Sequence, residues 1–219
     1  MRVLVLSGAG RYADPWHDFA ATSAALAGVL AAGGREVSIE DDVERGLADL
    51  AATDLLVVNV GNPTDGAPAP ASAAAIAGLR TYVGRGGPVL AVHTAATTFT
   101  TEPDWSPAIG GRWVRGTTMH PPFGPALVRT VAPQHPVAAG VGDLELDDER
   151  YSYLATEPGV SVLYEHEHDG RSHPVIWALE TAGGRRAVYD GLGHTAATYE
   201  HAGHRRLLRQ AAGWLLRDS

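Results

Sequence analysis

The strongest constraint on the fold comes from residues 89–92, a run of four apolar side chains that leads directly into His93. A short continuous apolar run is typical of a strand buried on both faces of a parallel sheet. Alanines stand two residues from His93 on either side, at Ala91 and Ala95. Small residues around a functional one mark a sharp strand-to-helix turn at the carboxyl edge of an α/β sheet, where ligands bind. We therefore expect an α/β fold in which His93 faces a ligand.

Further strands are predicted in the first half of the chain. Apolar runs at residues 3–6 and 55–58 are each followed by a loop of glycine or asparagine, and residues 36–40 form a weaker strand. Right-handed crossover connections place the carboxyl ends of such strands along one edge of the sheet. We expect the residues that follow strands 3–6, 55–58 and 89–92 to converge there.

The helices expected between these strands have recognisable starts and ends. Asp14 and Pro15 provide an N-cap and a first-turn proline, so the first helix should begin there, carry His17 in its first turn and end at Gly33. Other helices are expected at residues 42–50, 71–83 and 201–216.

The second half of the chain has a different texture. Residues 94–125 are rich in Thr, Pro, Gly and Trp, and a loop of this length inside a compact domain is usually functional. An Asp169–Gly170 pair predicts a β-hairpin. Strands are expected at residues 126–131, 160–164, 174–177 and 186–190. The prediction is a mostly parallel central sheet with a β-rich C-terminal half.

Composition limits the function classes. The 219 residues are 45% hydrophobic, which suits a single compact domain over residues 1–219. A net charge of −8 with scattered arginines gives no electrostatic footprint for nucleic acid or an anionic membrane. The chain has no cysteine, so thiol chemistry is excluded. The first apolar run is too short for a signal peptide and no run could span a membrane, so we expect a cytoplasmic protein.

Three residues are the leading catalytic candidates. His93 stands at the predicted turn, although a histidine there can also cap the next helix. His194 follows the last predicted strand between glycine-rich residues that let backbone approach a ligand closely. Glu149 belongs to the acidic run 147–149, and a carboxylate beside either imidazole would set its tautomer and orientation. Asp148 is the next choice in that run, which could instead be a solvated turn.

Four other residues are candidates for substrate binding. His17 near a helix start is expected to be neutral, because the helix dipole disfavours a cation there. His120 lies in the long loop. Trp113 and Tyr151 could form an aromatic platform for a sugar ring, with a place in the apolar core as the alternative.

The remaining histidines are expected to be structural or exposed. His166 and His168 have the spacing of two metal ligands on one strand face, but an exposed hairpin tip is the favoured interpretation. His135 and His173 each begin a new element, while His201 and His204 are predicted to lie on the surface of the last helix. Residues 7–10 resemble only part of a dinucleotide-binding loop, so NAD binding is not expected.

Taken in order, short motifs spread over nearly the whole chain resemble the ThuA-like family, named for trehalose utilisation. These are His17, Ala91-Val92-His93, Gly110-Gly111-Arg112-Trp113 with His120, His135-Pro136-Val137, Asp148-Glu149-Arg150-Tyr151, His173-Pro174-Val175-Ile176-Trp177, and Gly184-Arg185-Arg186 leading to Leu192-Gly193-His194. The resemblance implies a three-layer α/β sandwich of the flavodoxin-like, class I glutamine-amidotransferase-like type. His93 would replace the amidotransferase cysteine. It also implies a role in the catabolism of trehalose and related disaccharides through keto-sugars.

The working hypothesis is an enzyme that cleaves a disaccharide or keto-sugar by a hydrolytic or lyase-type reaction. His93, His194 and Glu149 would form its acid–base cluster, and His17 and His120 would position the substrate or a metal. Two alternatives stay open. One is a metal-dependent hydrolase that uses zinc or manganese on the same cluster; the other is a non-catalytic module that binds a sugar or a partner. The expected partner is a small-molecule carbohydrate, and a homo-oligomer is left open.

Overall fold

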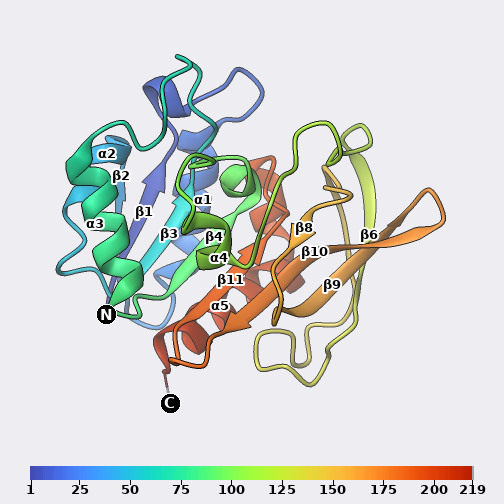
Figure 1. Cartoon of the computed structure of the whole chain (residues 1–219). Coiled ribbons are helices and arrows are strands. Elements are labelled where there is room, and N and C mark those ends of the chain that lie inside the picture. Colours follow the sequence, from blue (N-terminus) through green and yellow to red (C-terminus); the bar gives the residue numbers. More distant parts are fainter. Residues whose placement is uncertain (219) are drawn as a thin grey trace.

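A nine-stranded sheet forms the centre of the molecule in the computed structural model, which describes residues 1–218 (Figure 1). Its order is β2-β1-β3-β4-β11-β10-β9-β6-β7. The first five of these strands run parallel: β2 (Glu36–Glu40), β1 (Arg2–Ser7), β3 (Leu55–Asn59), β4 (Val89–Val92) and β11 (Arg186–Asp190). The other four join in antiparallel fashion: β10 (Arg171–Glu180), β9 (Ser161–His168), β6 (Gly124–Thr130) and β7 (Leu144–Asp148). The expectation of a mostly parallel sheet is therefore wrong in the C-terminal half, because hairpins rather than helices connect those strands.

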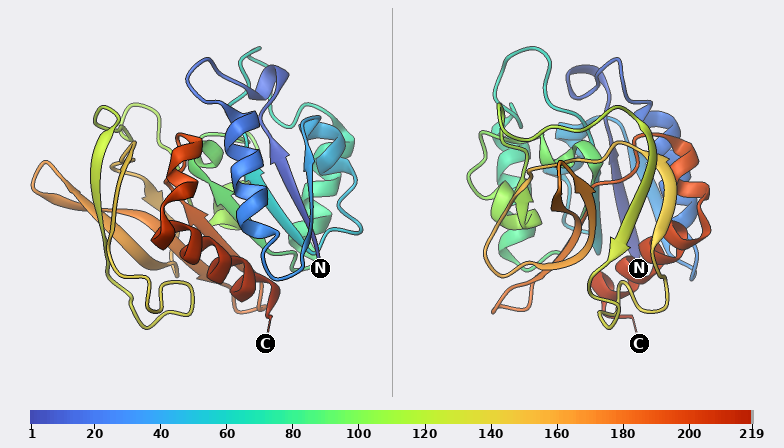
Figure 2. Two further views of the ribbon diagram at one scale, coloured as in Figure 1. Left: turned by 180° about the vertical axis from the view of Figure 1, so that it is seen from behind. Right: turned by 90° about the vertical axis from the view of Figure 1, so that its right-hand side faces the viewer.

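Helices cover both faces of the parallel half, which gives three layers (Figure 2). On one face lie α1 (Phe19–Leu30) and α5 (Ala202–Leu216), and on the other lie α2 (Val43–Ala48), α3 (Ala73–Gly84) and α4 (Trp105–Ile109). Three short 3-10 helices come after strands β1, β4 and β11, respectively: η1 (Gly10–Tyr12), η2 (His93–Ala96) and η3 (Ala196–Glu200). The two-stranded sheet of β5 (Gly111–Arg112) and β8 (Ala155–Thr156) pairs segments of two long connections.

Successive side chains along each strand point to opposite faces of the sheet, so the hydrophobic core is divided between the two faces. In β3, Leu55 and Val57 pack toward α1 and α5, while Leu56 and Val58 pack toward α2 and α3. All four side chains are fully buried. This explains why the predicted strands are continuously apolar rather than alternating. Among the described residues 1–218, no helix has both the length and the apolar character needed to cross a membrane.

The first helix begins later than expected. Asp18 is its N-cap and accepts a hydrogen bond from the backbone N–H of Ala21, so the helix starts at Phe19. Asp14 instead accepts the backbone N–H groups of Trp16 and His17, and it closes a turn ahead of the helix. The prediction that placed His17 in the first helical turn is wrong, because two acidic residues could each cap and the second one does. His17 lies in a loop.

The predicted hairpin is confirmed. Asp169 and Gly170 both have positive φ, 50° and 69°, and connect β9 to β10. Positive φ at both central positions matches the twist of the flanking strands.

Candidate functional site

His93 lies where the sheet topology and the local turn predict it. It follows β4, opens η2, and adopts a φ of 47°, a left-handed conformation that non-glycine residues rarely take. Its backbone carbonyl accepts a hydrogen bond from the Tyr189 hydroxyl at 2.9 Å. Its side chain is 1% exposed, and the Nδ1–H group donates to the Gly191 carbonyl at 2.9 Å. The Nε2 atom therefore carries the lone pair that faces the site.

His194 reaches the same place from the neighbouring strand. It follows β11, which pairs in parallel with β4, so the two loops leave the sheet at the same edge. The Asp148 carboxylate holds this loop, since it accepts the backbone N–H of Gly193 at 2.9 Å and of His194 at 3.2 Å. Asp148 also accepts the Thr198 hydroxyl at 2.7 Å. The acidic run is thus not a solvated turn: Asp148 is buried and orders the loop that carries His194.

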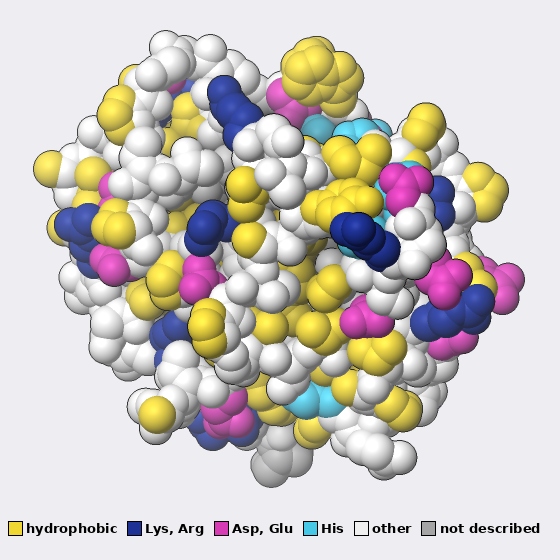
Figure 3. All heavy atoms as spheres, turned by 45° about the vertical axis from the view of Figure 1, so that its right-hand side comes forward, with side chains coloured by type: hydrophobic (Ala, Val, Ile, Leu, Met, Phe, Trp, Pro, Cys, Tyr) yellow, Lys and Arg dark blue, Asp and Glu magenta, His cyan; other side chains and the backbone are white. Residues whose placement is uncertain are grey.

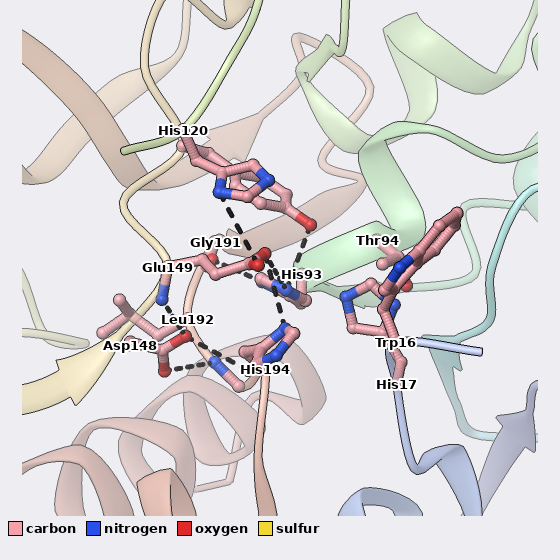
Figure 4. Close-up of polar contacts among 12 residues, drawn as sticks. Trp16, His17, His93, Thr94, His120, Asp148, Glu149, Gly191, Leu192 and His194 are labelled. Atoms are coloured by element: carbon pink, nitrogen blue, oxygen red, sulfur yellow. Dashed lines mark hydrogen bonds and ion pairs between the residues drawn. The ribbon is translucent and has the colours of Figure 1, made fainter. Parts of the chain in front are cut away.

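Glu149 follows the end of β7 and lies between the imidazoles (Figure 4). Its Oε2 atom is 3.4 Å from Nε2 of His93 and 3.4 Å from Nδ1 of His194. Its Oε1 atom is 3.6 Å from Nδ1 of His120. The structure therefore brings together the three residues predicted as catalytic and one predicted as substrate-binding.

His17 completes the cluster from the loop before α1. Its Nδ1–H group donates to both oxygens of Asp14, at 2.7 and 2.9 Å. Its ring centroid lies 4.7 Å from that of His194 and 5.2 Å from that of His93. The Nε2 atom points into the cluster and has no hydrogen-bond partner in the described part of the chain.

The pKa values of His17 and His194 are shifted in opposite directions. Burial, together with the charges of His93 and His194, holds the pKa of His17 below its ordinary value and outweighs the effect of Asp14. The interaction with Glu149 raises the pKa of His194 against the effect of burial. Burial acts to raise the pKa of Glu149, but His194 and His93 outweigh it and hold that pKa well below the usual range. Glu149 is therefore a carboxylate and His17 a neutral imidazole at neutral pH.

Tyr151 supports the cluster from one side. Its hydroxyl donates to Nε2 of His93 at 3.0 Å, and its ring stacks on the His93 ring with centroids 4.4 Å apart. Burial raises the pKa of Tyr151 well above its ordinary value, so the phenol stays a hydrogen-bond donor. Tyr151 is 3% exposed, so its ring face is not available as a sugar platform.

The cluster opens into a cavity of about 610 Å³. Trp113 and His120 line this cavity, as predicted, and Trp113 packs edge-on against Tyr151. His120 is half-exposed and donates Nδ1–H to the Pro121 carbonyl at 3.0 Å, so its Nε2 is available to a ligand. Figure 3 shows histidine side chains reaching the surface next to hydrophobic ones. The other lining residues are Asp14, Trp16, His17, Asn62, Pro63, Thr64, Thr94, Thr97, Glu149, Tyr151 and His194.

Two site residues were not identified from the sequence. Asp14 was assigned only as a helix cap, and no motif indicated that it would orient His17. Trp16 is 75% exposed at the mouth of the cavity, and its only sequence signal is that a large aromatic side chain follows Pro15 in a loop.

Several predictions for the other histidines need correction. His204 is fully buried, not on the surface, and its two ring nitrogens contact Oδ2 of Asp190 at 2.6 Å and the Thr198 carbonyl at 3.1 Å. His201 is the N-cap of α5 and accepts the backbone N–H of His204 through Nδ1.

The hairpin histidines are also less exposed than predicted. His166 is buried and its Nε2–H donates to the Tyr151 carbonyl at 3.0 Å, so it supports the site from behind rather than lying at an exposed tip. His173 is buried and accepts the backbone N–H of Tyr153, which confirms a structural role. His135 caps its own turn by accepting the Val137 N–H.

Four residues could hold a metal ion. One ligand atom from each of His17, His93, Glu149 and His194 lies within 4.8 Å of the others. Without a metal, Nε2 of His17 and the Glu149 carboxylate can accept hydrogen bonds from a substrate hydroxyl, and the adjacent His120 can transfer a proton.

Comparison with known families decides the relationship. The family model ThuA, described as trehalose utilisation, matches residues 2–215. The chain belongs to the ThuA family. The resemblance drawn from the short motifs is confirmed, and ThuA membership supports a carbohydrate-related role.

Solved structures share the ThuA-family fold seen here. A ThuA-like protein from Parabacteroides merdae is 19% identical, with a TM-score of 0.76 over 98% of this chain and 89% of its own. One from Bacteroides uniformis is 17% identical, with a TM-score of 0.76 over 98% and 90%. A glutamine amidotransferase from Thermotoga maritima is 11% identical, with a TM-score of 0.60 over 100% and 98%. These likenesses confirm the amidotransferase-like α/β fold. Comparison with curated protein sequences gives no significant match.

Proposed function

We propose that this ThuA-family chain is an enzyme that cleaves a small-molecule carbohydrate, by hydrolysis or by elimination from a keto-sugar. The observation that carries the proposal is the convergence of His93, Glu149 and His194 at the carboxyl edge of the sheet, where Glu149 and His194 line a cavity and His93 lies buried behind them. Ligands of open α/β sheets bind at this edge. The family description, trehalose utilisation, supports a sugar as the substrate.

The cluster is suited to accept hydrogen bonds from a hydroxyl group of the substrate. His93 and His17 each have one ring nitrogen committed to a fixed acceptor, Gly191 and Asp14. Their second nitrogens are therefore held in one orientation before substrate binds. Preorganised polar groups cost little reorganisation during reaction.

His120 is the proton carrier in this proposal. Its Nδ1–H bond to Pro121 leaves Nε2 as an acceptor on the cavity side. A keto group acidifies the neighbouring C–H bond, so a neutral imidazole can remove that proton and start elimination. The same nitrogen can instead take a proton from water in a hydrolysis. In either reaction the proton then passes to the leaving oxygen of the sugar.

Trp16 is the aromatic residue best placed to meet a sugar ring. Its side chain lines the cavity and is largely exposed, whereas the ring of Tyr151 is covered by His93. An exposed indole offers an apolar face together with one hydrogen-bond donor. Trp113 contributes a second wall.

A turnover screen tests the proposal. Disaccharides and their keto derivatives are incubated with the protein as purified, and products are followed by mass spectrometry. We expect turnover that falls about 10²–10⁴-fold in Glu149→Gln and in His120→Ala. His168→Ala is the matched control, since that histidine lies in the hairpin outside the cavity and should leave turnover unchanged.

The screen also distinguishes a non-catalytic module. Calorimetry measures whether a disaccharide binds to the folded protein. Binding without conversion of any substrate would show that the protein binds sugar but is not an enzyme. Turnover that survives in both cavity variants would show that the reaction occurs elsewhere.

A further inference from the structure

Two imidazole nitrogens in the cluster are buried without a hydrogen-bond partner. Among residues 1–218, neither Nε2 of His17 nor Nδ1 of His194 makes such a bond. Buried polar atoms are nearly always paired, and an exception calls for a physical explanation. Because both atoms point toward the same small space, a cation between them would satisfy both.

Two distances between proposed ligand atoms match a metal shell, and all four atoms lie within 4.8 Å of one another. Oε2 of Glu149 is 3.4 Å from Nε2 of His93 and 3.4 Å from Nδ1 of His194. Ligands that lie 2.0–2.1 Å from a tetrahedral ion are about 3.3–3.4 Å from one another. Direct charge-assisted N–H···O bonds are shorter, about 2.7–2.9 Å. The side chains thus surround a gap rather than closing on one another.

The second ring nitrogens of two ligands are fixed as they are in metal sites. Asp14 accepts Nδ1–H of His17, and the Gly191 carbonyl accepts Nδ1–H of His93. Metal-bound histidines almost always donate their other N–H to a carboxylate or backbone carbonyl, which sets the tautomer and aims the lone pair. In this cluster His17 has the carboxylate acceptor and His93 has the carbonyl acceptor.

From these three observations we propose that His17, His93, Glu149 and His194 bind one divalent transition-metal ion. The donor set identifies the class of ion. Three imidazoles and one carboxylate suit zinc, manganese or ferrous iron, whereas magnesium and calcium prefer oxygen donors. When bound, such an ion supplies a Lewis acid that polarises a carbonyl or activates water. His120 lies outside this ligand set and keeps its role as proton carrier.

The experiment measures metal rather than turnover. The untagged protein, purified without chelators, is analysed for zinc, manganese and iron; chelated protein is then titrated with Zn²⁺, Mn²⁺ and Mg²⁺ by calorimetry. We expect about one ion per chain and much weaker binding of Mg²⁺. His17→Ala and His93→Ala should each weaken Zn²⁺ binding at least 100-fold, and Asp14→Asn should weaken it about 10–100-fold.

A matched control lies in the same cavity. His120→Ala should retain one ion per chain, because its side chain does not belong to the ligand set. Circular dichroism checks that each variant is folded, and absorption of the Co²⁺-loaded protein reports coordination directly. A folded wild type that binds none of the three transition metals, or binding unchanged in both His17→Ala and His93→Ala, would overturn the metal site. Either result is independent of the turnover screen, which tests the proposed function.

Discussion

The carboxylate of Asp148 accepts the backbone N–H of His194 at 3.2 Å, and this contact ties the end of β7 to the loop after β11. The two strands lie at different places in the sheet, separated by β10, β9 and β6. Glu149, which follows directly after β7, is thereby held beside the imidazole of His194. One buried side chain thus fixes the distance between two residues of the candidate site.

Replacing Asp148 should destabilise the protein and loosen the site. Asp148→Ala leaves the N–H groups of Gly193 and His194 and the Thr198 hydroxyl without their acceptor, so we expect a loss of about 3 kcal/mol or more in the free energy of unfolding. Urea denaturation measures it. Asp147→Ala, on the exposed side of the same strand, should stay within about 0.5 kcal/mol. Equal losses of stability in Asp148→Ala and Asp147→Ala would contradict the proposed role of Asp148 in holding the loop.

Gly193 should not tolerate a side chain. Its φ is 114°, and a Cβ atom would collide with the Tyr199 hydroxyl. Gly193→Ala is therefore expected to displace His194, lowering both Zn²⁺ affinity and the melting temperature. Calorimetry and thermal denaturation follow the two effects. Gly183→Ala is the control, because its Cβ would meet only the far end of Thr181, and the prediction fails if both variants behave alike.

The buried pair of His204 and Asp190 should make stability depend on pH. Burial acts to lower the pKa of His204, but Asp190 outweighs it and the pKa is raised. A raised folded-state pKa stabilises fully below the unfolded value of about 6.5 and loses that contribution as pH rises through the folded-state pKa. Relative to wild type, His204→Gln should therefore be most destabilised near pH 6 and less so at alkaline pH. Urea denaturation from pH 5.5 to 9 checks this, and a deficit that grows with pH would refute it.

Metal should stabilise the fold if the proposed site exists. An ion that binds only the native state at a free concentration of 100 times its Kd adds about 2.7 kcal/mol to the free energy of unfolding. Chelation should remove this increment, measured as a lower melting temperature, and Zn²⁺ should restore it. In His17→Ala the chelator should have little effect. A wild-type melting temperature that changes with neither chelator nor Zn²⁺ would argue against the metal site.

Trp16 should contribute to substrate binding and little to folding. Its side chain is 75% exposed, so Trp16→Ala should leave the free energy of unfolding within about 0.5 kcal/mol. Loss of one aromatic contact of about 0.5–1.5 kcal/mol corresponds to roughly a 2- to 13-fold rise in KM for a turned-over sugar. Val131→Ala, an exposed apolar residue away from the cavity, is the control. An unchanged KM in Trp16→Ala would show that Trp16 does not contact the sugar.

Local patterns in the sequence predicted the parallel half of the fold and the positions of His93 and His194 at one edge of the sheet. The run before His93 is continuously apolar because β4 is buried on both faces, and a parallel strand must end at the ligand-binding edge. The predicted strand before His194 placed that residue at the same edge, because β11 pairs in parallel with β4. Each of these features depends on neighbours within a few residues, so the pattern was sufficient.

Only the tertiary structure decided which polar side chains meet. Asp14 and Asp18 are both suitable caps by sequence, and packing selects Asp18 for the helix and leaves Asp14 to orient His17. His204 was expected at the surface, although it lies three and four residues before Leu207 and Leu208 on the buried face of α5, and Asp190 compensates its charge in the interior. Glu149 reaches the histidines because the neighbouring Asp148 binds the backbone of the loop that carries His194. Such partners are distant in the chain, and no local propensity encodes which of many carboxylates and imidazoles will lie within contact distance.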